Sequence, residues 1–83
     1  MGYIMVTVYR GQGLRAVIFL DDHEPAHVHV FGDGQAKINL LGKDGKPELV
    51  WVDGMKRSEV RRAMEIVMER QAELLARWRE IHG

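Results

Sequence analysis

Residues 21–30 read DDHEPAHVHV, and this stretch ends one strand of the chain and begins the next. Two aspartates and Pro25 disfavour strand structure, and the proline restricts Glu24 to an extended conformation, so residues 21–25 are expected to interrupt a sheet. From Ala26 onward polar and apolar residues alternate, which is the period of a strand with two different faces. The same stretch holds three of the four histidines, so a strand boundary coincides with the main candidate for a functional site.

The flanking residues predict an antiparallel meander of four or five strands over about residues 3–52. Glycine pairs at 11–13 and 32–34 predict hairpin turns, and the polar segment 42–47 predicts a loop. Between these turns the sequence alternates or is continuously apolar, and it is rich in β-branched and aromatic residues. The predicted strands are residues 3–9, 14–20, 26–31, 35–41 and 48–52.

From about residue 56 the apolar residues recur with the helical period of 3.6. There is no glycine or proline from Ser58 until Gly83, so one helix over about residues 56–82 is expected, with Ser58 or Asp53 as its N-cap. Such a helix is about 37 Å long, whereas a strand of six or seven residues spans about 20–23 Å. The helix therefore either bends near Arg70 and Gln71 or extends past the sheet to another chain.

The second alternative predicts a partner interface near the end of the helix. Its apolar residues are Leu74, Leu75, Trp78 and Ile81. The partner is expected to be a small cognate protein or a second copy of the chain. In either case the predicted fold is α+β: one domain over residues 1–83, with an antiparallel meander packed against one long C-terminal helix.

Composition excludes several classes of function. Twelve basic and twelve acidic residues balance, which disfavours a nucleic-acid binder that relies on overall charge. With no cysteine, the chain has no disulfide framework, no thiolate zinc site and no cysteine nucleophile. No apolar run approaches the ~20 residues of a membrane span, and Arg10 and Arg15 interrupt the only candidate signal peptide. The expected location is cytoplasmic, with no membrane contact.

His27 and His29 lie two residues apart on a predicted strand, so their side chains share one face about 6.6–7 Å apart. His23 lies in the preceding turn, from which it could fold back toward that face. This pattern suits a divalent transition metal such as zinc, nickel or ferrous iron, held by His23, His27 and His29. Asp21, Asp22 or Glu24 would then act as a further ligand or orient one, with Asp22 the residue expected to orient a ligand.

The same three histidines also suit acid–base catalysis without a metal, since imidazoles titrate near neutral pH. A ribonuclease of this kind needs a cation beside the phosphate, and Arg10, Arg15 and Lys37 are candidates. The simplest alternative is an exposed strand on which the histidines have no chemical role.

Binding of duplex DNA is a further alternative. It would use four cations near the start of the helix: Lys56, Arg57, Arg61 and Arg62. The zero net charge makes this the least favoured function.

The motif Asp22-His23-x-Pro25-x-His27-x-His29 resembles a small bacterial family designated domain of unknown function 4160. The resemblance covers most of the chain and includes Gly32 and Trp78. The chain departs from the family pattern at three positions: Ala26 (usually proline), Val28 (usually phenylalanine) and Arg77 (usually asparagine).

Such genes often lie beside another small domain family in pairs described as toxin–antitoxin modules. The resemblance therefore implies a toxin-like component with a histidine-centred site, and RNA is the expected substrate. The alternative is a non-catalytic metal-binding or protein-interaction module.

Overall fold

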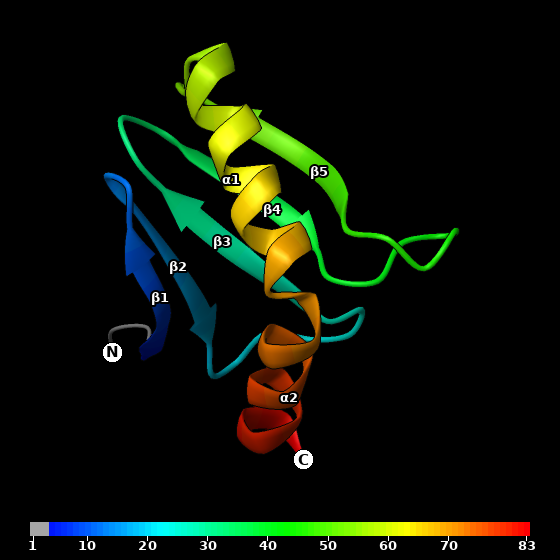
Figure 1. Cartoon of the computed structure of the whole chain (residues 1–83). Coiled ribbons are helices and arrows are strands. Elements are labelled where there is room, and N and C mark those ends of the chain that lie inside the picture. The colour runs from blue at the N-terminus through cyan, green and yellow to red at the C-terminus, as the bar shows by residue number, and fades with distance from the viewer. Residues whose placement is uncertain (1–3) are drawn as a thin grey trace.

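Five antiparallel strands form one sheet, and their order in the sheet is their order in the chain (Figure 1). The computed structural model describes residues 4–83. The strands are β1 (Met5–Gly11), β2 (Leu14–Phe19), β3 (His27–Phe31), β4 (Gln35–Asn39) and β5 (Glu48–Asp53). The predicted meander is confirmed with five strands, and Tyr3, where the first strand was expected to begin, lies outside the described residues.

Both predicted hairpin turns are present. Gln12 and Gly13 join β1 to β2 with positive φ values of 54° and 75°, a conformation typical of two-residue hairpin turns. The turn between β3 and β4 is closed by the N–H of Gly32, which donates to the carbonyl oxygen of Gly34 at 2.9 Å. A Cβ at residue 34 would collide with the carbonyl oxygen of Asp53, so only glycine fits where the end of β5 passes this turn.

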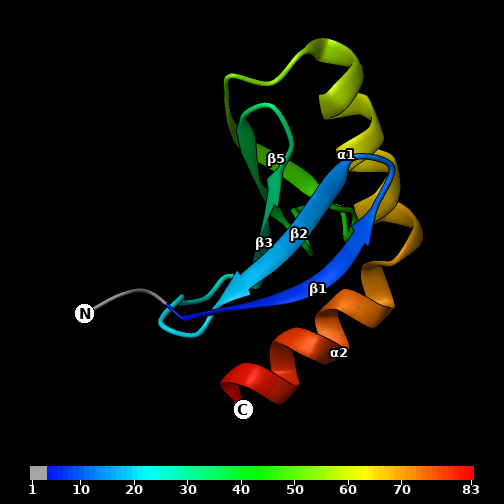
Figure 2. The ribbon, with the colours of Figure 1, turned by 90° about the vertical axis from the view of Figure 1, so that its left-hand side faces the viewer.

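The alternation predicted for the first strand is broken by a bulge. The register of β1 against β2 shifts between Thr7 and Tyr9, which leaves Val8 as an extra residue. As a result both Val8 and Tyr9 pack against the core, although strict alternation would place them on opposite faces. A bulge of this kind bends and twists the strand, and β1 and β2 curve across the molecule in Figure 2.

Two helices, α1 (Arg57–Glu69) and α2 (Gln71–His82), cover one side of the sheet (Figure 2). The core fills the space between the sheet and the two helices. It contains Leu14, Ala16, Ile18, Val28, Val30, Ile38, Leu40, Ala63, Ile66, Val67, Leu74 and Trp78. Among the described residues, neither helix combines the length and the apolar character needed to cross a membrane.

One long helix was expected and two are present, because the chain bends at Arg70; the bend near Arg70 and Gln71, one of the two alternatives, is thus confirmed. Arg70 leaves helical geometry with φ −112° and ψ 19° and separates α1 from α2. Beside the bend, the side-chain amide of Gln71 donates to the carbonyl oxygens of Leu40 and Gly45, at 2.7 and 2.9 Å. The bend lets α2 keep contact with the sheet instead of running past it, which was the other alternative.

The predicted partner residues mostly lie against the chain's own core. Leu74 and Trp78 are only 0% and 2% exposed, so the prediction that these two face a partner is wrong for the chain as described. Leu75 and Ile81 are partly buried against the same core. In the described residues the helix therefore does not extend past the sheet, which was the arrangement that suggested a partner. A partner contact through Leu75 or Ile81 stays a prediction.

The start of α1 is tied to the turn between β3 and β4 by a buried carboxylate. Glu59 is 6% exposed and accepts the N–H of Asp33 at 3.0 Å and that of Lys56 at 3.4 Å. The N-cap is Lys56, not Ser58 or Asp53 as expected. Glu59 thus holds the start of α1 to the turn that follows β3, the strand that carries His27 and His29.

Candidate metal centre

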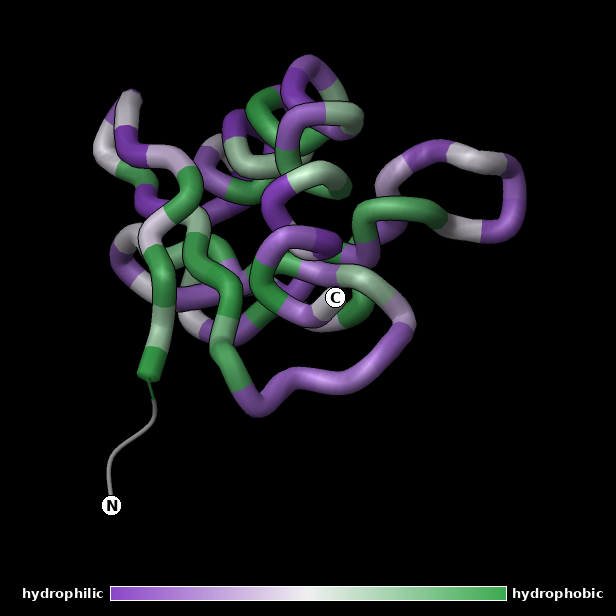
Figure 3. Tube along the Cα trace, turned by 90° about the horizontal axis from the view of Figure 1, so that it is seen from below, coloured by the Kyte–Doolittle hydropathy of each residue, from purple (hydrophilic) through white to green (hydrophobic). Residues whose placement is uncertain are grey.

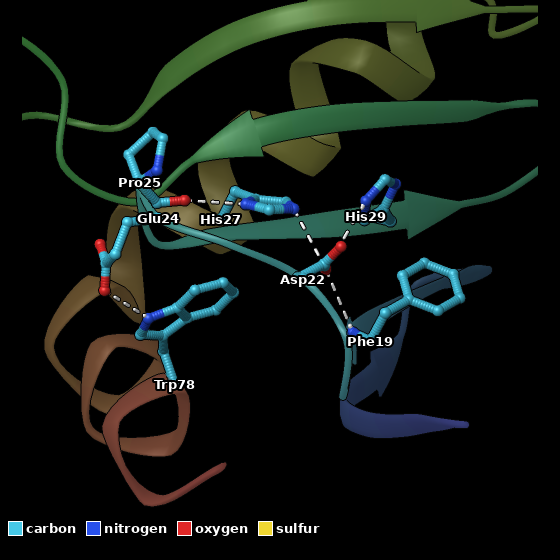
Figure 4. A network of polar contacts seen from close by, with 7 residues as sticks. All are labelled: Phe19, Asp22, Glu24, Pro25, His27, His29 and Trp78. Atoms are coloured by element: carbon cyan, nitrogen blue, oxygen red, sulfur yellow. Dashed lines mark hydrogen bonds and ion pairs between the residues drawn. The ribbon is translucent and has the colours of Figure 1, made fainter. Parts of the chain in front are cut away.

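The segment between β2 and β3 folds its second aspartate back toward the sheet. In Figure 3 residues 21–25 form a hydrophilic stretch that follows the apolar strand β2. The backbone N–H of Asp22 donates to the carbonyl oxygen of Phe19 at 3.2 Å, and Oδ2 of Asp22 accepts the N–H of Phe19 at 3.3 Å. These two bonds close a tight turn that aims the Asp22 carboxylate at the histidines of β3 (Figure 4).

His27, the first residue of β3, is 4% exposed and has both ring nitrogens engaged. Nδ1 lies 2.8 Å from the carbonyl oxygen of Pro25, and Nε2 lies 3.1 Å from Oδ2 of Asp22 (Figure 4). Because a carbonyl oxygen can only accept, Nδ1 carries the hydrogen. In the neutral ring Nε2 then presents its lone pair to a carboxylate oxygen, so a proton or a metal ion is needed between these two electron-rich atoms.

His29 points to the same place from the same face of β3. The rings of His27 and His29 are 5.2 Å apart, and Nε2 of His29 is 3.9 Å from Oδ2 of Asp22, too far for a hydrogen bond. Its Nδ1 is buried without a hydrogen-bond partner among the described residues.

Burial lowers the pKa of His29 below its ordinary value of 6.5. Asp22 opposes this effect, while His27 and Lys37 add to it. The ring is therefore neutral near pH 7 and can bind a metal through a lone pair.

One ligand atom from each of Asp22, His27 and His29 lies within 4.8 Å of the other two. Tetrahedral ligands at about 2.0–2.1 Å from zinc are separated by about 3.3–3.4 Å. The Asp22–His27 distance of 3.1 Å is close to this value, and the distance of 3.9 Å from Nε2 of His29 to Oδ2 of Asp22 is longer than it. Two imidazoles and one carboxylate form a known ligand set for divalent transition metals.

The surroundings of these three residues also suit a metal. The bond from His27 to the Pro25 carbonyl is the kind that fixes the tautomer and the orientation of a ligating imidazole. A hollow of about 230 Å³, lined by Phe19, Asp21, Asp22 and His29, adjoins the group and has room for water or a small ligand.

The structure brings together His27 and His29, as expected, but not His23. His23 is exposed in the loop and lies outside the converging group, so it does not fold back toward His27 and His29. Asp22, expected mainly to orient a ligand, instead offers a ligand atom itself. The third member of the group is therefore a carboxylate and not an imidazole.

Trp78 supports the site from α2, a role that the sequence did not indicate. Its Nε1 donates to Oε2 of Glu24 at 3.0 Å, and its ring lies 5.2 Å from that of His27 (Figure 4). The two hydrogen-bonded residues are 54 positions apart, so no local pattern reveals their contact. The loop beside the site is thus held by the C-terminal helix.

The cations proposed to lie near the histidines differ in position. Lys37 is directly opposite His29 across β3 and β4, and Arg15 lies over the ring of Phe31 at 5.6 Å. Arg10 is exposed on β1, opposite Arg15. Lys37 is therefore the cation that the register places beside His29.

The chain has a relationship to one known family. No curated protein and no solved structure matches it. A family model described as "Domain of unknown function (DUF4160)" matches residues 13–79, a span that contains the whole Asp22, His27 and His29 group. Because the match covers most of the sequence, the chain belongs to the DUF4160 family.

Proposed function

We propose that the chain is a metal-binding domain in which Asp22, His27 and His29 hold one divalent transition-metal ion. The observation that carries this proposal is the position of the two ring nitrogens of His27. Its Nδ1 is committed to the Pro25 carbonyl at 2.8 Å, so in the neutral ring its Nε2 lone pair faces the Asp22 carboxylate at 3.1 Å. A metal ion between these atoms turns a repulsive contact into two bonds and takes His29 as the third ligand.

With three protein ligands, such an ion would keep an open coordination position. Structural zinc sites are usually closed by four protein ligands, whereas catalytic sites use three and leave one position for water. The group found among the described residues has three members, and the hollow at Asp21 and Phe19 lies next to it. Zinc, nickel and ferrous iron all fit this ligand set, and a bound water would become acidic enough to supply hydroxide near neutral pH.

The proposed biological role is that of a toxin-like component of a toxin–antitoxin pair acting on RNA. The support is the role that the family resemblance implies and the open position beside the ion. An ion held by Asp22, His27 and His29 would supply hydroxide for hydrolysis of an RNA phosphodiester, in which phosphorus gains an oxygen from water, its bond to the leaving ribose oxygen breaks and that oxygen takes up a proton. Expression of the parent should then arrest growth, and the His27→Ala/His29→Ala variant should not.

A second candidate is acid–base catalysis by the two histidines without a metal. It is favoured by the pKa of His29, which burial lowers, because a neutral imidazole is available as a base near pH 7. His27, beside Asp22, would supply the acid when protonated. Metal content separates the two candidates.

The test is elemental analysis of untagged protein after exposure to zinc, nickel or ferrous iron and removal of free metal. The parent is expected to hold about one ion per chain, and the His27→Ala/His29→Ala variant is expected to hold none while its circular dichroism stays that of the parent. His23→Ala is the matched control, since His23 is exposed in the same motif and outside the group. It should bind metal as the parent does.

Two results would contradict the metal centre. One is a parent that takes up no metal, and growth arrest by such a protein would instead support the metal-free candidate. The other is loss of metal in His23→Ala with retention in the double variant, which would place the ligands elsewhere in the loop.

A further inference from the structure

One row of residues crosses the sheet on the face that carries the histidines. The strand registers place directly opposite one another Thr7, Val17, His29, Lys37 and Trp51, one from each strand from β1 to β5. Directly opposite residues in antiparallel strands project to the same face. Both helices cover the other face, on which Val28 and Val30 join the core (Figure 2). Among the described elements, neither helix lies over this row, and α2 reaches the same face only through Trp78, whose ring contacts His27 at the start of β3.

Aromatic rings stand on both sides of His29 on this face. The ring of Phe19 is 4.9 Å from that of His29 and the ring of Trp51 is 5.9 Å from it, both in T-shaped contact. Trp51 is 38% exposed on β5, whereas Trp78 is 2% exposed and belongs to the core. A large ring is thus left accessible to solvent beside the proposed metal centre, where a planar ligand could stack on it.

Positive charge lies between this ring and the metal centre. Lys37 is opposite His29 on one side and opposite Trp51 on the other. Arg15 follows on the same face, over the ring of Phe31. A divalent ion bound by Asp22 would reverse the sign of the charge contributed by that carboxylate, so the middle of the face would attract an anion. Asp53, opposite Gln35, is an acidic residue farther along β5.

We propose that this face binds a single-stranded nucleic acid, with a base stacked on Trp51 and the adjoining phosphate held by Lys37 and the metal ion. The inference names the substrate class of the proposed metal centre and rests on that proposed function. An unpaired base offers a ring face to an aromatic side chain, whereas bases in a duplex are already stacked. Stacking also suits a chain with zero net charge, because it does not depend on a large basic surface.

The experiment uses the fluorescence of Trp51, which stacking should quench while the buried Trp78 supplies a constant background. Metal-loaded protein is titrated with oligo(U) and with oligo(dT) of about twelve nucleotides, and with polyphosphate as a polyanion that has no bases. The two oligonucleotides distinguish RNA from DNA as the source of the bases. Both metal-loaded and metal-free protein are measured.

The variants separate stacking from charge. Trp51→Leu is expected to weaken oligonucleotide binding, followed by anisotropy, at least about fivefold, while Trp51→Phe keeps a stacking ring and most of the affinity. Lys37→Gln should lower the slope of log K against log salt by about 0.7. The matched control is Arg57→Gln/Arg61→Gln, which removes two exposed cations from α1, in the helical layer on the other side of the sheet.

The inference is overturned if Trp51→Leu binds as tightly as Trp51→Phe, if polyphosphate binds as well as the oligonucleotides, or if only the α1 variant loses binding. The last result would place nucleic acid at the helix start. Elemental analysis of Trp51→Leu keeps the two proposals apart, since this variant should still hold one metal ion. Metal binding without oligonucleotide binding refutes this inference alone. Trp51-dependent binding by a chain that takes up no metal refutes the metal centre and its contact to the phosphate, and leaves the stacking on Trp51.

Discussion

The Glu59→Ala variant should unfold at a markedly lower denaturant concentration than the parent. Glu59 is 6% exposed, and its two carboxylate oxygens accept the N–H groups of Asp33 and Lys56, at 3.0 and 3.4 Å. The contact is tight, because a Cβ at Gly32 would lie 2.5 Å from Oε2 of Glu59. Alanine leaves the N–H of Asp33 without this acceptor and opens a gap between α1 and the turn that follows β3.

The magnitude follows from the two hydrogen bonds. A bond to a charged group contributes about 1.5–3 kcal/mol, and the longer bond to Lys56 adds less, so Glu59→Ala should lower the free energy of unfolding by about 2–4 kcal/mol. For a domain of this size that corresponds to a fall in Tm of roughly 8–30 °C. Glu59→Gln keeps one acceptor oxygen and should lie between the parent and the alanine variant.

Urea unfolding followed by far-UV circular dichroism measures the effect. Glu65→Ala is the control, because Glu65 is an exposed carboxylate on the same helix and should change stability by less than about 0.5 kcal/mol. If Glu59→Ala unfolds at the same urea concentration as Glu65→Ala, the carboxylate does not hold the helix to the turn and the reasoning fails.

Three further predictions concern the histidines and the helix bend. Because burial lowers the pKa of His29 below 6.5, the unfolded metal-free chain binds that proton more readily than the folded chain. The contribution of neutral His29 to the stability of the folded chain should be complete above pH 6.5 and be lost as the pH falls toward the lowered pKa. Urea titrations at several pH values should therefore show a weaker pH dependence of stability in His29→Gln than in the parent. Zinc at a hundred times its Kd should stabilise the parent by about 2.7 kcal/mol and raise its Tm by roughly 10–20 °C, with no rise in His27→Ala/His29→Ala by calorimetry. Gln71→Ala, which removes the donor to both carbonyl oxygens at the bend, should cost about 1–2 kcal/mol in thermal unfolding, and a cost equal to that of Glu69→Ala, a change at an exposed residue beside the bend, would argue against an anchoring role.

Much of the sheet could be predicted because its signals are local. Alternation and apolar runs located all five strands, and the glycines at 13 and 34 marked turns in which either a positive φ or a missing Cβ is required. The bulge at Val8 gave no signal, because alternating β-branched residues read the same with or without an extra residue in the register. The presence of each strand was therefore predictable, whereas the face of the sheet to which each side chain points was predictable only where the register is regular.

The helix shows the opposite case. Its periodicity continues through Arg70, so the sequence left open whether the helix bends there or runs on, and the chain bends and buries Leu74 and Trp78 in its own core. Removing these two large side chains from water favours the bend by about 3 kcal/mol or more. Whether such a helix bends or runs on to a partner depends on what lies beneath it, which its own sequence does not contain.

For the site, the sequence alone determined that His27 and His29 share one face, because side chains two apart on a strand always do. Only the tertiary structure decided which residue joins them. Asp22 is aimed at the histidines by its bonds to the backbone of Phe19, while the neighbouring His23 stays exposed. Trp78 reaches the same loop through Glu24 from 54 positions away. The side-chain directions of a loop depend on hydrogen bonds to distant groups, so they follow from the assembled fold and not from the order of the residues.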